Sequence, residues 1–285
     1  GCTPLESARI PCMDRLASTG ELGMARTVKS GFPPGSDVAN MAVLGLDPAR
    51  FYTGRAPIEA VSMGVDLGPE DTAFRINLVT LGIHDGRTVM EDYCSDHIST
   101  REARALIEDL KSILHDLPQV SFHPGIEYRH LMVIRGYDRP GLRTTPPHDI
   151  AGEDVSPHLP NDEMLLRIMQ RSQEVLADHP VNRFRKEKGL RQATSLWPWG
   201  EGKAMTVPSL KEEYGITGAM ISAVDLLKGL ARLRGMEVVE VPGATGWLDT
   251  NYEGKARAAL ETLTRHDFAY VHVEAPDEAG HAGSL

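Results

Sequence analysis

The chain has 285 residues, 41% of them apolar and 25% charged, as expected for a globular protein with one large or two smaller domains. Its net charge of −10 argues against nucleic acid and anionic membranes as partners, although a local Arg/Lys cluster can still bind a phosphorylated ligand. Apolar runs are too short to cross a bilayer. Cys2, Cys12 and Cys94 form no paired pattern, so we expect free thiols and a cytoplasmic protein; the oligomeric state stays open.

The first sixty residues predict helices separated by a stiff turn. Residues 3–6 are typical of a helix start with Pro in its first turn, and residues 30–35 contain two prolines. A short helix is expected from Asp37 onward with its N-terminus at Ser36, where unpaired backbone N–H groups can bind an anion. The chain opens inside helical sequence, so we expect a longer polypeptide that is truncated here at both ends.

The middle of the chain predicts strands, helices and hairpins. Residues 72–81 alternate like a half-buried strand, and His84 to Arg87 is typical of a hairpin turn. The elements expected there are strands at 72–81 and 89–93, a helix at 99–114 that starts with an N-terminal cap at Ser99, strands at 120–123 and 128–135, a loop at 138–160 and a helix at 163–178. This order favours a small α+β domain.

The last third alternates between strands and helices. The elements expected there are strands at 195–200 and 219–224, a helix at 225–234, a strand at 237–241, a helix at 255–264 and a strand at 268–273. Such β-α-β-α-β order indicates a parallel sheet. We therefore expect an α/β protein. Residues 1–63 and 193–285 would form a domain with a mostly parallel sheet sandwiched by helices, and residues 64–192 a smaller inserted α+β domain.

One acidic residue and one histidine follow the last expected strand and could share a metal ion. Asp277 and His281 are four residues apart on an expected short turn at its carboxyl end, the edge where open α/β sheets keep their ligand sites. A carboxylate and an imidazole suit Mn²⁺ or Zn²⁺. Taken alone, the pair is equally well explained as a surface acid and a loop histidine.

Ser36 is the candidate nucleophile. A hydroxyl beside a divalent cation can lose its proton and attack phosphorus. The simpler interpretation of a lone serine at this place is an ordinary helix cap.

Several further residues suit a phosphorylated ligand, and each has an ordinary surface role as its alternative. Arg129 and Arg135 lie six apart on one expected strand face, where guanidinium groups bind phosphate or carboxylate. Lys211 could neutralise a phosphoryl group. The candidates for acid–base or substrate contacts are His97, His148 and Asp149.

Together these segments resemble the archaeal-type branch of the cofactor-independent phosphoglycerate mutases, which also occurs in bacteria. The resemblance covers essentially the whole chain, and its motifs are weak one by one. They lie at residues 3–6, 35–41, 77–80, 96–100, 128–130, 147–150, 197–200, 221–226, 241–246, 249–255 and 277–283.

The resemblance implies an isomerase of the alkaline phosphatase superfamily that interconverts 3-phosphoglycerate and 2-phosphoglycerate in glycolysis and gluconeogenesis. It implies two divalent cations, with Mn²⁺ expected first and Mg²⁺, Co²⁺ or Zn²⁺ as alternatives, and no need for 2,3-bisphosphoglycerate. The partner would be a small phosphorylated three-carbon acid.

The resemblance also implies roles for particular residues. Ser36 matches the nucleophile that becomes phosphoserine and a metal ligand, while Asp277 and His281 match ligands of one metal. Lys211 resembles the lysine that touches the phosphoryl group. The inserted domain would hold the glycerate, with His97 matching a histidine that faces substrate and Arg129 and Arg135 as further contacts.

Parts of the family pattern are missing from these residues. The N-terminal Asp-Gly motif, the later Asp-His pair and the final metal histidine are not among them. Two alternatives therefore stay open: a phosphatase or other phosphomutase of the same superfamily, and a catalytically inactive relative.

Overall fold

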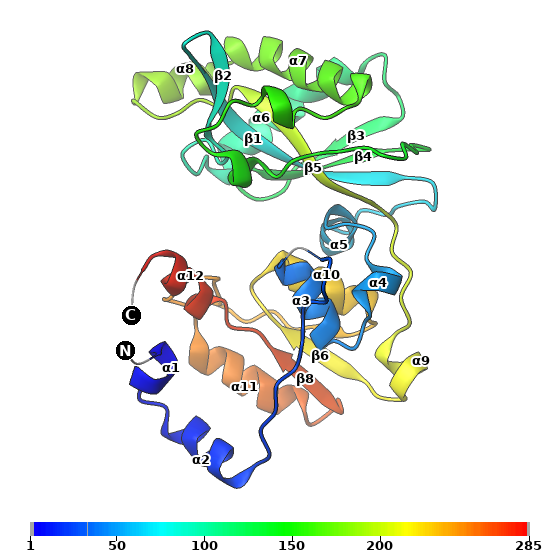
Figure 1. The fold of residues 1–285 in the computed structure, drawn as a ribbon, viewed down its shortest axis with the longest axis vertical. Coiled ribbons are helices and arrows are strands. Elements are labelled where there is room, and N and C mark those ends of the chain that lie inside the picture. The colour runs from blue at the N-terminus through cyan, green and yellow to red at the C-terminus, as the bar shows by residue number, and fades with distance from the viewer. Residues whose placement is uncertain (1–2, 33, 284–285) are drawn as a thin grey trace. The chain divides into compact units, whose positions relative to one another are not determined.

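The computed structural model describes residues 3–32 and 34–283, which form two compact units (Figure 1). Unit 1 comprises Gly1–Arg50, Leu210–Ala231 and Gly235–Leu285, and unit 2 comprises Phe51–Ser209 with Arg232–Arg234. The division into functional domains at residues 63/64 and 192/193 stays a prediction. Each unit is described by itself.

Unit 2 is built on an antiparallel sheet of five strands. Its strands are β1 (Thr72–His84), β2 (Arg87–Asp92), β3 (Val120–His123), β4 (Arg129–Ile134) and β5 (Ser195–Lys203). The order is β2-β1-β4-β3, and β5 pairs with β1. The two predicted hairpins are present, with His84 opposite Arg87 and His123 opposite Leu131.

Helices cover one face of this sheet (Figure 1). Phe74, Ile76 and Leu78 of β1 point into a core that α6 (Thr100–Leu110) and α7 (Glu163–Ala177) complete. Burying each such side chain contributes roughly 1.5–3 kcal/mol. A capping box formed by Ser99 and Glu102 begins α6, as the sequence predicted. The other helices of unit 2 are α5 (Ala56–Ser62) and α8 (Pro180–Glu187).

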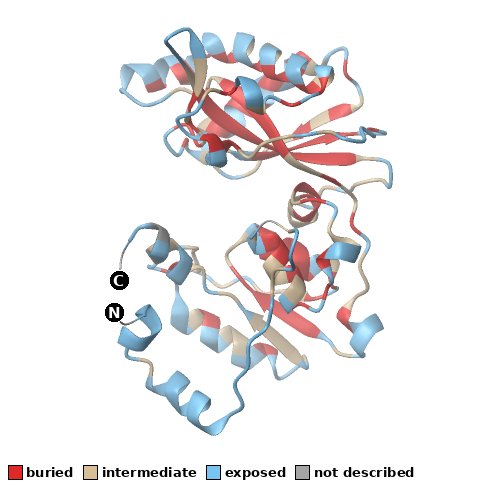
Figure 2. Ribbon diagram, viewed as in Figure 1, coloured by how far each residue is buried: buried red, intermediate tan, exposed pale blue. Residues whose placement is uncertain are grey.

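The opposite face of β1 carries Arg75, Asn77 and Val79, because side chains alternate along a strand. In the register of the sheet, Arg75 lies opposite Trp199 of β5 and Asn77 lies opposite Arg129 of β4. Both faces of β1 are buried from Thr72 to Thr80, as the colouring of Figure 2 shows. The expectation of a half-buried strand was therefore wrong for this stretch.

Unit 1 contains the predicted parallel sheet. Its strands β6 (Gly218–Ile221), β7 (Glu237–Val238) and β8 (Phe268–Val271) have the order β7-β6-β8 and are all parallel. The helices of this part of the chain are α1 (Pro4–Ser7), α2 (Pro11–Thr19), α3 (Ser36–Val43), α4 (Pro48–Phe51), α9 (Leu210–Tyr214), α10 (Asp225–Leu233), α11 (Tyr252–Thr262) and α12 (Ala275–His281).

The fold is thus a mixed α/β fold, and one expectation needs correction. The parallel sheet expected for residues 1–63 and 193–285 has three strands in the described part of unit 1, and residues 195–200, which were expected in that domain, do not belong to it. Strand β5 pairs with β1, so residues 195–203 belong to the antiparallel sheet. The likeness to alkaline phosphatase in detail stays a prediction.

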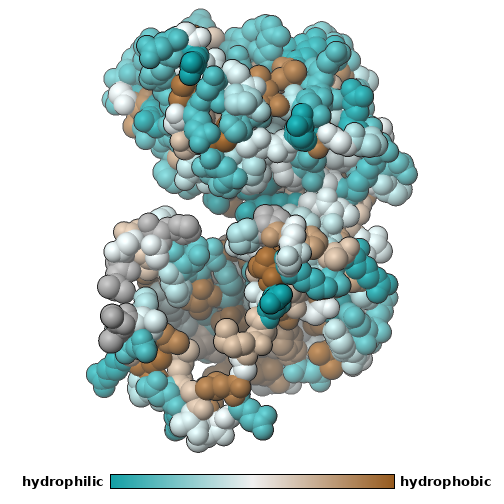
Figure 3. Space-filling model, viewed as in Figure 1, coloured by the Kyte–Doolittle hydropathy of each residue, from teal (hydrophilic) through white to brown (hydrophobic). Residues whose placement is uncertain are grey.

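Large apolar side chains are exposed in unit 1, among them Leu16, Leu260 and Val271. Brown atoms are correspondingly visible on the face drawn in Figure 3. These side chains are scattered over short amphipathic segments, and none of the helices described is long and apolar enough to span a bilayer.

Candidate active site

Ser36 is the first residue of α3 and is exposed at the helix N-terminus, where the helix dipole favours an anion. The turn that follows is anchored to the parallel sheet: Asn40 donates to the Ser36 carbonyl (2.8 Å) and accepts from the Tyr270 hydroxyl of β8 (2.6 Å). The N-cap is Gly35, and the N-terminus of α3 has no side-chain cap. The alternative of Ser36 as an ordinary cap is therefore not supported.

Asp277 lies in the first turn of α12 and is exposed. The sequence was interpreted as a short turn, but residues 275–281 are helical, with the Asp277 N–H donating to the Glu274 carbonyl (2.9 Å). A helix therefore takes the place of the short turn that the sequence predicted for this segment. The His281 side chain lies outside the described part of the structure.

Two residues of unit 1 have the donor chemistry that a divalent cation prefers. The Asp277 carboxylate and the Ser36 hydroxyl are hard oxygen donors of the kind that Mn²⁺ and Mg²⁺ prefer. Across the described residues, no group of three or more His, Cys, Asp or Glu side chains is placed to share one ion. These residues therefore offer part of a ligand set.

Lys211 is exposed on α9, which precedes β6 in the chain. It lies before the amino end of β6, whereas Asp277 follows the carboxyl end of β8, and these two strands run parallel. The fold thus places Lys211 and Asp277 beyond opposite ends of the parallel sheet. The phosphoryl contact expected for Lys211 stays a prediction.

A row of aromatic rings joins five segments of unit 2. We call it the aromatic strip, and its members are His97, Tyr128, Tyr93, His148 and Trp199. Successive centroids are 6.1, 5.9, 6.1 and 5.2 Å apart, all in edge-on geometry. It brings together two of the predicted substrate contacts, His97 and His148, from segments fifty residues apart.

Two arginines stack on the aromatic strip. Arg129 lies 5.2 Å from the centre of the Tyr128 ring, and Arg75 lies 4.1 Å from the Trp199 ring. Glu127 approaches both Arg129 (3.7 Å) and His97 (3.9 Å). The strip therefore combines flat rings with fixed guanidinium groups, which suits a small anion.

Arg75 was not predicted as a site residue. It is almost fully buried, and its Nε lies 2.9 Å from Glu59 Oε2, while Arg55 Nε lies 3.1 Å from Glu59 Oε1. Burial lowers the pKa of Arg75 to about 10; Glu59 opposes this shift, and Arg55 and Arg129 add to it. Glu59 thus pairs with both arginines, and these three side chains together keep an excess of positive charge.

His148 lies at the same end of the strip, edge-on to Trp199. Burial lowers its pKa; Asp149, whose carboxylate is 3.5 Å away, opposes the shift, and the charges of Arg75 and Arg55 reinforce it. Neutral imidazole is therefore favoured at pH 7, where one ring nitrogen can donate and the other can accept.

The backbone before α6 is held in an unusual conformation at His97. Ser95, Asp96 and His97 have φ values of +48°, +57° and +48°, a region that costs non-glycine residues roughly 1–2 kcal/mol each. Asp92 holds this turn, because its carboxylate accepts from the backbone N–H groups of Cys94 (2.8 Å) and Asp96 (2.7 Å). Strain of this kind is concentrated at functional sites.

Arg135 is not part of the aromatic strip. It directly follows β4, whose first residue is Arg129, so the two arginines lie at opposite ends of that strand. The Arg135 N–H donates to the Gln119 carbonyl (2.9 Å). Its predicted substrate contact remains untested.

Comparison with known proteins identifies the family. The sequence model of the 2,3-bisphosphoglycerate-independent phosphoglycerate mutases matches residues 17–182. A protein of Geobacter sulfurreducens named as a probable enzyme of this kind is 53% identical over 288 positions, which cover all of this chain and 72% of the relative. The chain belongs to this family.

Further relatives agree. The mutase of the same name from Methanosarcina acetivorans is 52% identical over 99% of this chain and 71% of its own length. A solved structure from Pyrococcus horikoshii has a TM-score of 0.78 at 30% identity, covering 99% of this chain and 67% of that one. The cofactor-independent phosphoglycerate mutase from Thermoplasma acidophilum has a TM-score of 0.54 at 31% identity, covering 85% and 64%. The family recognised from sequence motifs, and with it the isomerase class, is confirmed.

Proposed function

We propose that this mutase interconverts 3-phosphoglycerate and 2-phosphoglycerate through a phosphoserine at Ser36. The observation that carries the proposal is the aromatic strip with Arg75 and Arg129 stacked on it, guanidinium groups that can bind an anion in a chain of net charge −10. A phosphoglycerate is a small acid with a phosphate and a carboxylate, and paired guanidinium groups bind both.

In this proposal unit 1 carries the chemistry of phosphoryl transfer. The Ser36 oxygen bonds to phosphorus while the bond from phosphorus to the substrate oxygen breaks, and the serine proton passes to the released glycerate hydroxyl. The N–H groups at the start of α3 stabilise the charge on the phosphoryl oxygens. Some of the ligands of the divalent cations would come from Asp277, residue 281 and Ser36, with Mn²⁺ expected first. Such cations would lower the pKa of the nucleophile and neutralise charge on the phosphoryl group. Transfer back to the other glycerate hydroxyl completes the isomerisation.

Unit 2 would bind the glycerate that phosphoryl transfer releases. Arg129 binds the carboxylate, Arg75 adds positive charge behind Trp199, and the rings of His148 and His97 hydrogen-bond the two hydroxyl groups. Asp149 orients His148. Trapping the glycerate is required, because water would otherwise hydrolyse the phosphoserine.

A coupled assay tests this function. The complete enzyme is given 3-phosphoglycerate and Mn²⁺, without 2,3-bisphosphoglycerate, and enolase converts the product to a chromophore. We expect turnover that stops when a chelator is added. Release of inorganic phosphate without mutase turnover would favour the phosphatase alternative, and the absence of both would favour an inactive relative.

A pair of arginine variants tests the binding site. Arg129→Met should raise KM for 3-phosphoglycerate roughly 10- to 100-fold, as expected when a charged hydrogen bond of about 1.5–3 kcal/mol is lost. The control is Arg183→Met on α8, where an exposed arginine pairs with Asp178 at 2.9 Å. Equal KM values for the two variants would contradict the assignment of the strip.

A further inference from the structure

Lys255 of α11 is buried to an extent that is rare for lysine, with 2% of its surface exposed. Its ammonium group donates to the carbonyl of His272 (3.1 Å), the first residue after β8. Burial lowers the pKa of Lys255, and the nearby Glu274 carboxylate opposes this shift. Burying a charged ammonium group costs free energy, so we expect a structural role that offsets this cost.

His272 makes contacts through both its backbone and its ring. Its backbone N–H donates to the Ile221 carbonyl of β6 (2.9 Å), so it extends the parallel ladder by one residue. Its ring lies between the Ser222 hydroxyl, 3.3 Å from Nδ1, and the Glu274 carboxylate, 3.0 Å from Nε2. Ser222 also accepts from the Val224 N–H (3.0 Å). Lys255 therefore completes a set of contacts that fixes one point at the carboxyl edge of the sheet.

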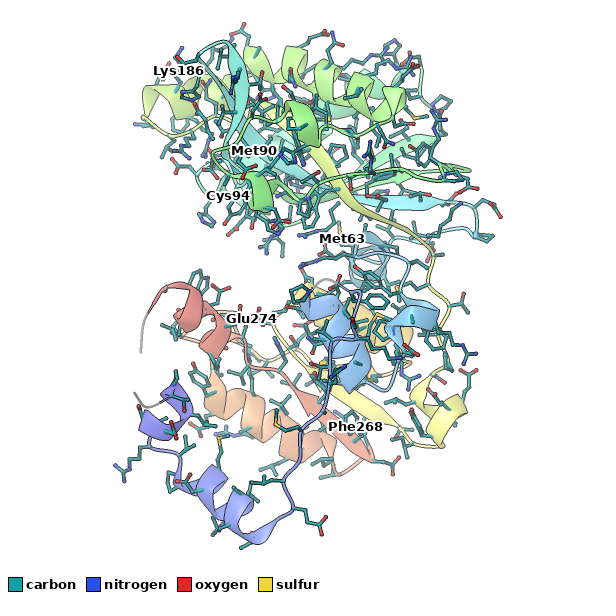
Figure 4. All side chains as sticks on the ribbon, viewed as in Figure 1. Met63, Met90, Cys94, Lys186, Phe268 and Glu274 are labelled. Carbon is teal, nitrogen blue, oxygen red and sulfur yellow. The ribbon has the colours of Figure 1, made fainter. Side chains whose placement is uncertain are left out.

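Glu274 connects His272 to the start of α12. It is the N-cap of that helix, and Figure 4 labels it where the chain passes from β8 to α12. Its carbonyl accepts from the N–H groups of Asp277 (2.9 Å) and Glu278 (3.3 Å), while its side chain is bound to His272. Each link from Lys255 to the Asp277 backbone is thus a hydrogen bond or ion pair within unit 1.

We propose that Lys255 is a positioning residue for the metal-binding segment: by holding the His272 carbonyl, it fixes the connection from β8 to α12 and thereby the carboxylate of Asp277. The inference rests on the proposed role of Asp277 as a metal ligand. Partners behind a metal ligand change metal affinity by about 10- to 100-fold when removed.

The test uses the complete enzyme and Mn²⁺ as the probe, with free Mn²⁺ measured by electron paramagnetic resonance. Lys255→Met should weaken Mn²⁺ binding about 10- to 100-fold. Saturating Mn²⁺ should restore kcat, and KM for 3-phosphoglycerate should be unchanged. The control is Lys228→Met, which removes a partly exposed lysine paired with Glu240 at 2.9 Å and should change Mn²⁺ affinity less than about twofold.

Two results would overturn the proposal: wild-type Mn²⁺ affinity in Lys255→Met, or a loss of kcat that excess Mn²⁺ does not restore. Asp277→Asn distinguishes a failure of the positioning role of Lys255 from a failure of the metal site itself. If it loses Mn²⁺ while Lys255→Met does not, only the positioning role fails; if it binds Mn²⁺ normally, the proposed metal site fails.

A second variant covers the case in which Lys255→Met does not fold, as judged by circular dichroism. Glu274→Gln keeps the size of the N-cap side chain but removes the charge that faces His272 and Lys255. It should weaken Mn²⁺ binding by several-fold with the same recovery at saturating metal. Unchanged Mn²⁺ affinity in this variant would also refute the positioning role.

Discussion

Replacing Trp199 with phenylalanine should destabilise unit 2, because this indole supports both the sheet and the aromatic strip. Its Nε1 donates to Asn77 Oδ1 at 2.9 Å, and Trp199 and Asn77 are 5% and 2% exposed. The variant leaves the buried Asn77 oxygen without this donor, at a cost of about 1–3 kcal/mol. The smaller ring also weakens the stacking with Arg75, by about 0.5–1 kcal/mol. The expected loss is therefore about 2–4 kcal/mol.

Native-state hydrogen exchange measures this loss within unit 2. A change of about 3 kcal/mol should make the most protected amides of β1 and β5 exchange about 100-fold faster, since 1.4 kcal/mol is tenfold. The control is Trp247→Phe in unit 1, where the tryptophan is 57% exposed and the change should stay within about 0.5 kcal/mol. Equal exchange of β1 amides in the two variants would refute the reasoning.

Three further predictions concern pH, backbone and metal. Burial lowers the pKa of His130 to about 3, so the unfolded chain binds one proton more between that value and pH 6.5, and stability falls as pH falls through this window. Urea unfolding should show wild type losing about 1.4 kcal/mol per pH unit relative to His130→Asn; parallel profiles would contradict this. Gly54 has φ +146°, and a Cβ there would collide with the Glu201 carbonyl, so Gly54→Ala should lower the melting temperature by several degrees, and an unchanged melting curve would show that the backbone can adjust. Asp277→Asn should reduce the metal content of the purified enzyme by elemental analysis, and full metal content would count against its role as a ligand.

Local patterns predicted the elements of both sheets. Alternation and a turn located the hairpin of β1 and β2, the Ser99 cap located the start of α6, and the alternation of strands and helices indicated the parallel sheet. These features depend on neighbours in sequence, which is why they could be predicted from one chain.

The aromatic strip could not be predicted in the same way. Its rings come from β5 and from segments next to β2, β4 and α6 as well as from residues 147–150, so their contacts depend on how distant parts of the chain pack together. Arg75 looked like a polar residue on a half-exposed strand, and only the pairing of β1 with β5 places it under Trp199. Lys255 was not singled out from the sequence, because its burial depends on how α11 packs on β8.

The motif residues fall between these cases. Ser36 was placed correctly at the start of a helix, because Gly and Pro precede it and apolar residues follow at helical spacing. Asp277 was placed after the correct strand but on a turn, since the seven-residue helix contains Pro and Gly, which are poor helix formers.

The most direct measurement of the central claim is the site of phosphorylation during turnover. The complete enzyme with Mn²⁺ and 3-phosphoglycerate is quenched within a single turnover, digested and analysed by mass spectrometry. We predict a phosphate on Ser36 that is absent when the same experiment is done with Ser36→Ala. A phosphate on another residue, or normal mutase turnover by Ser36→Ala, would contradict the account.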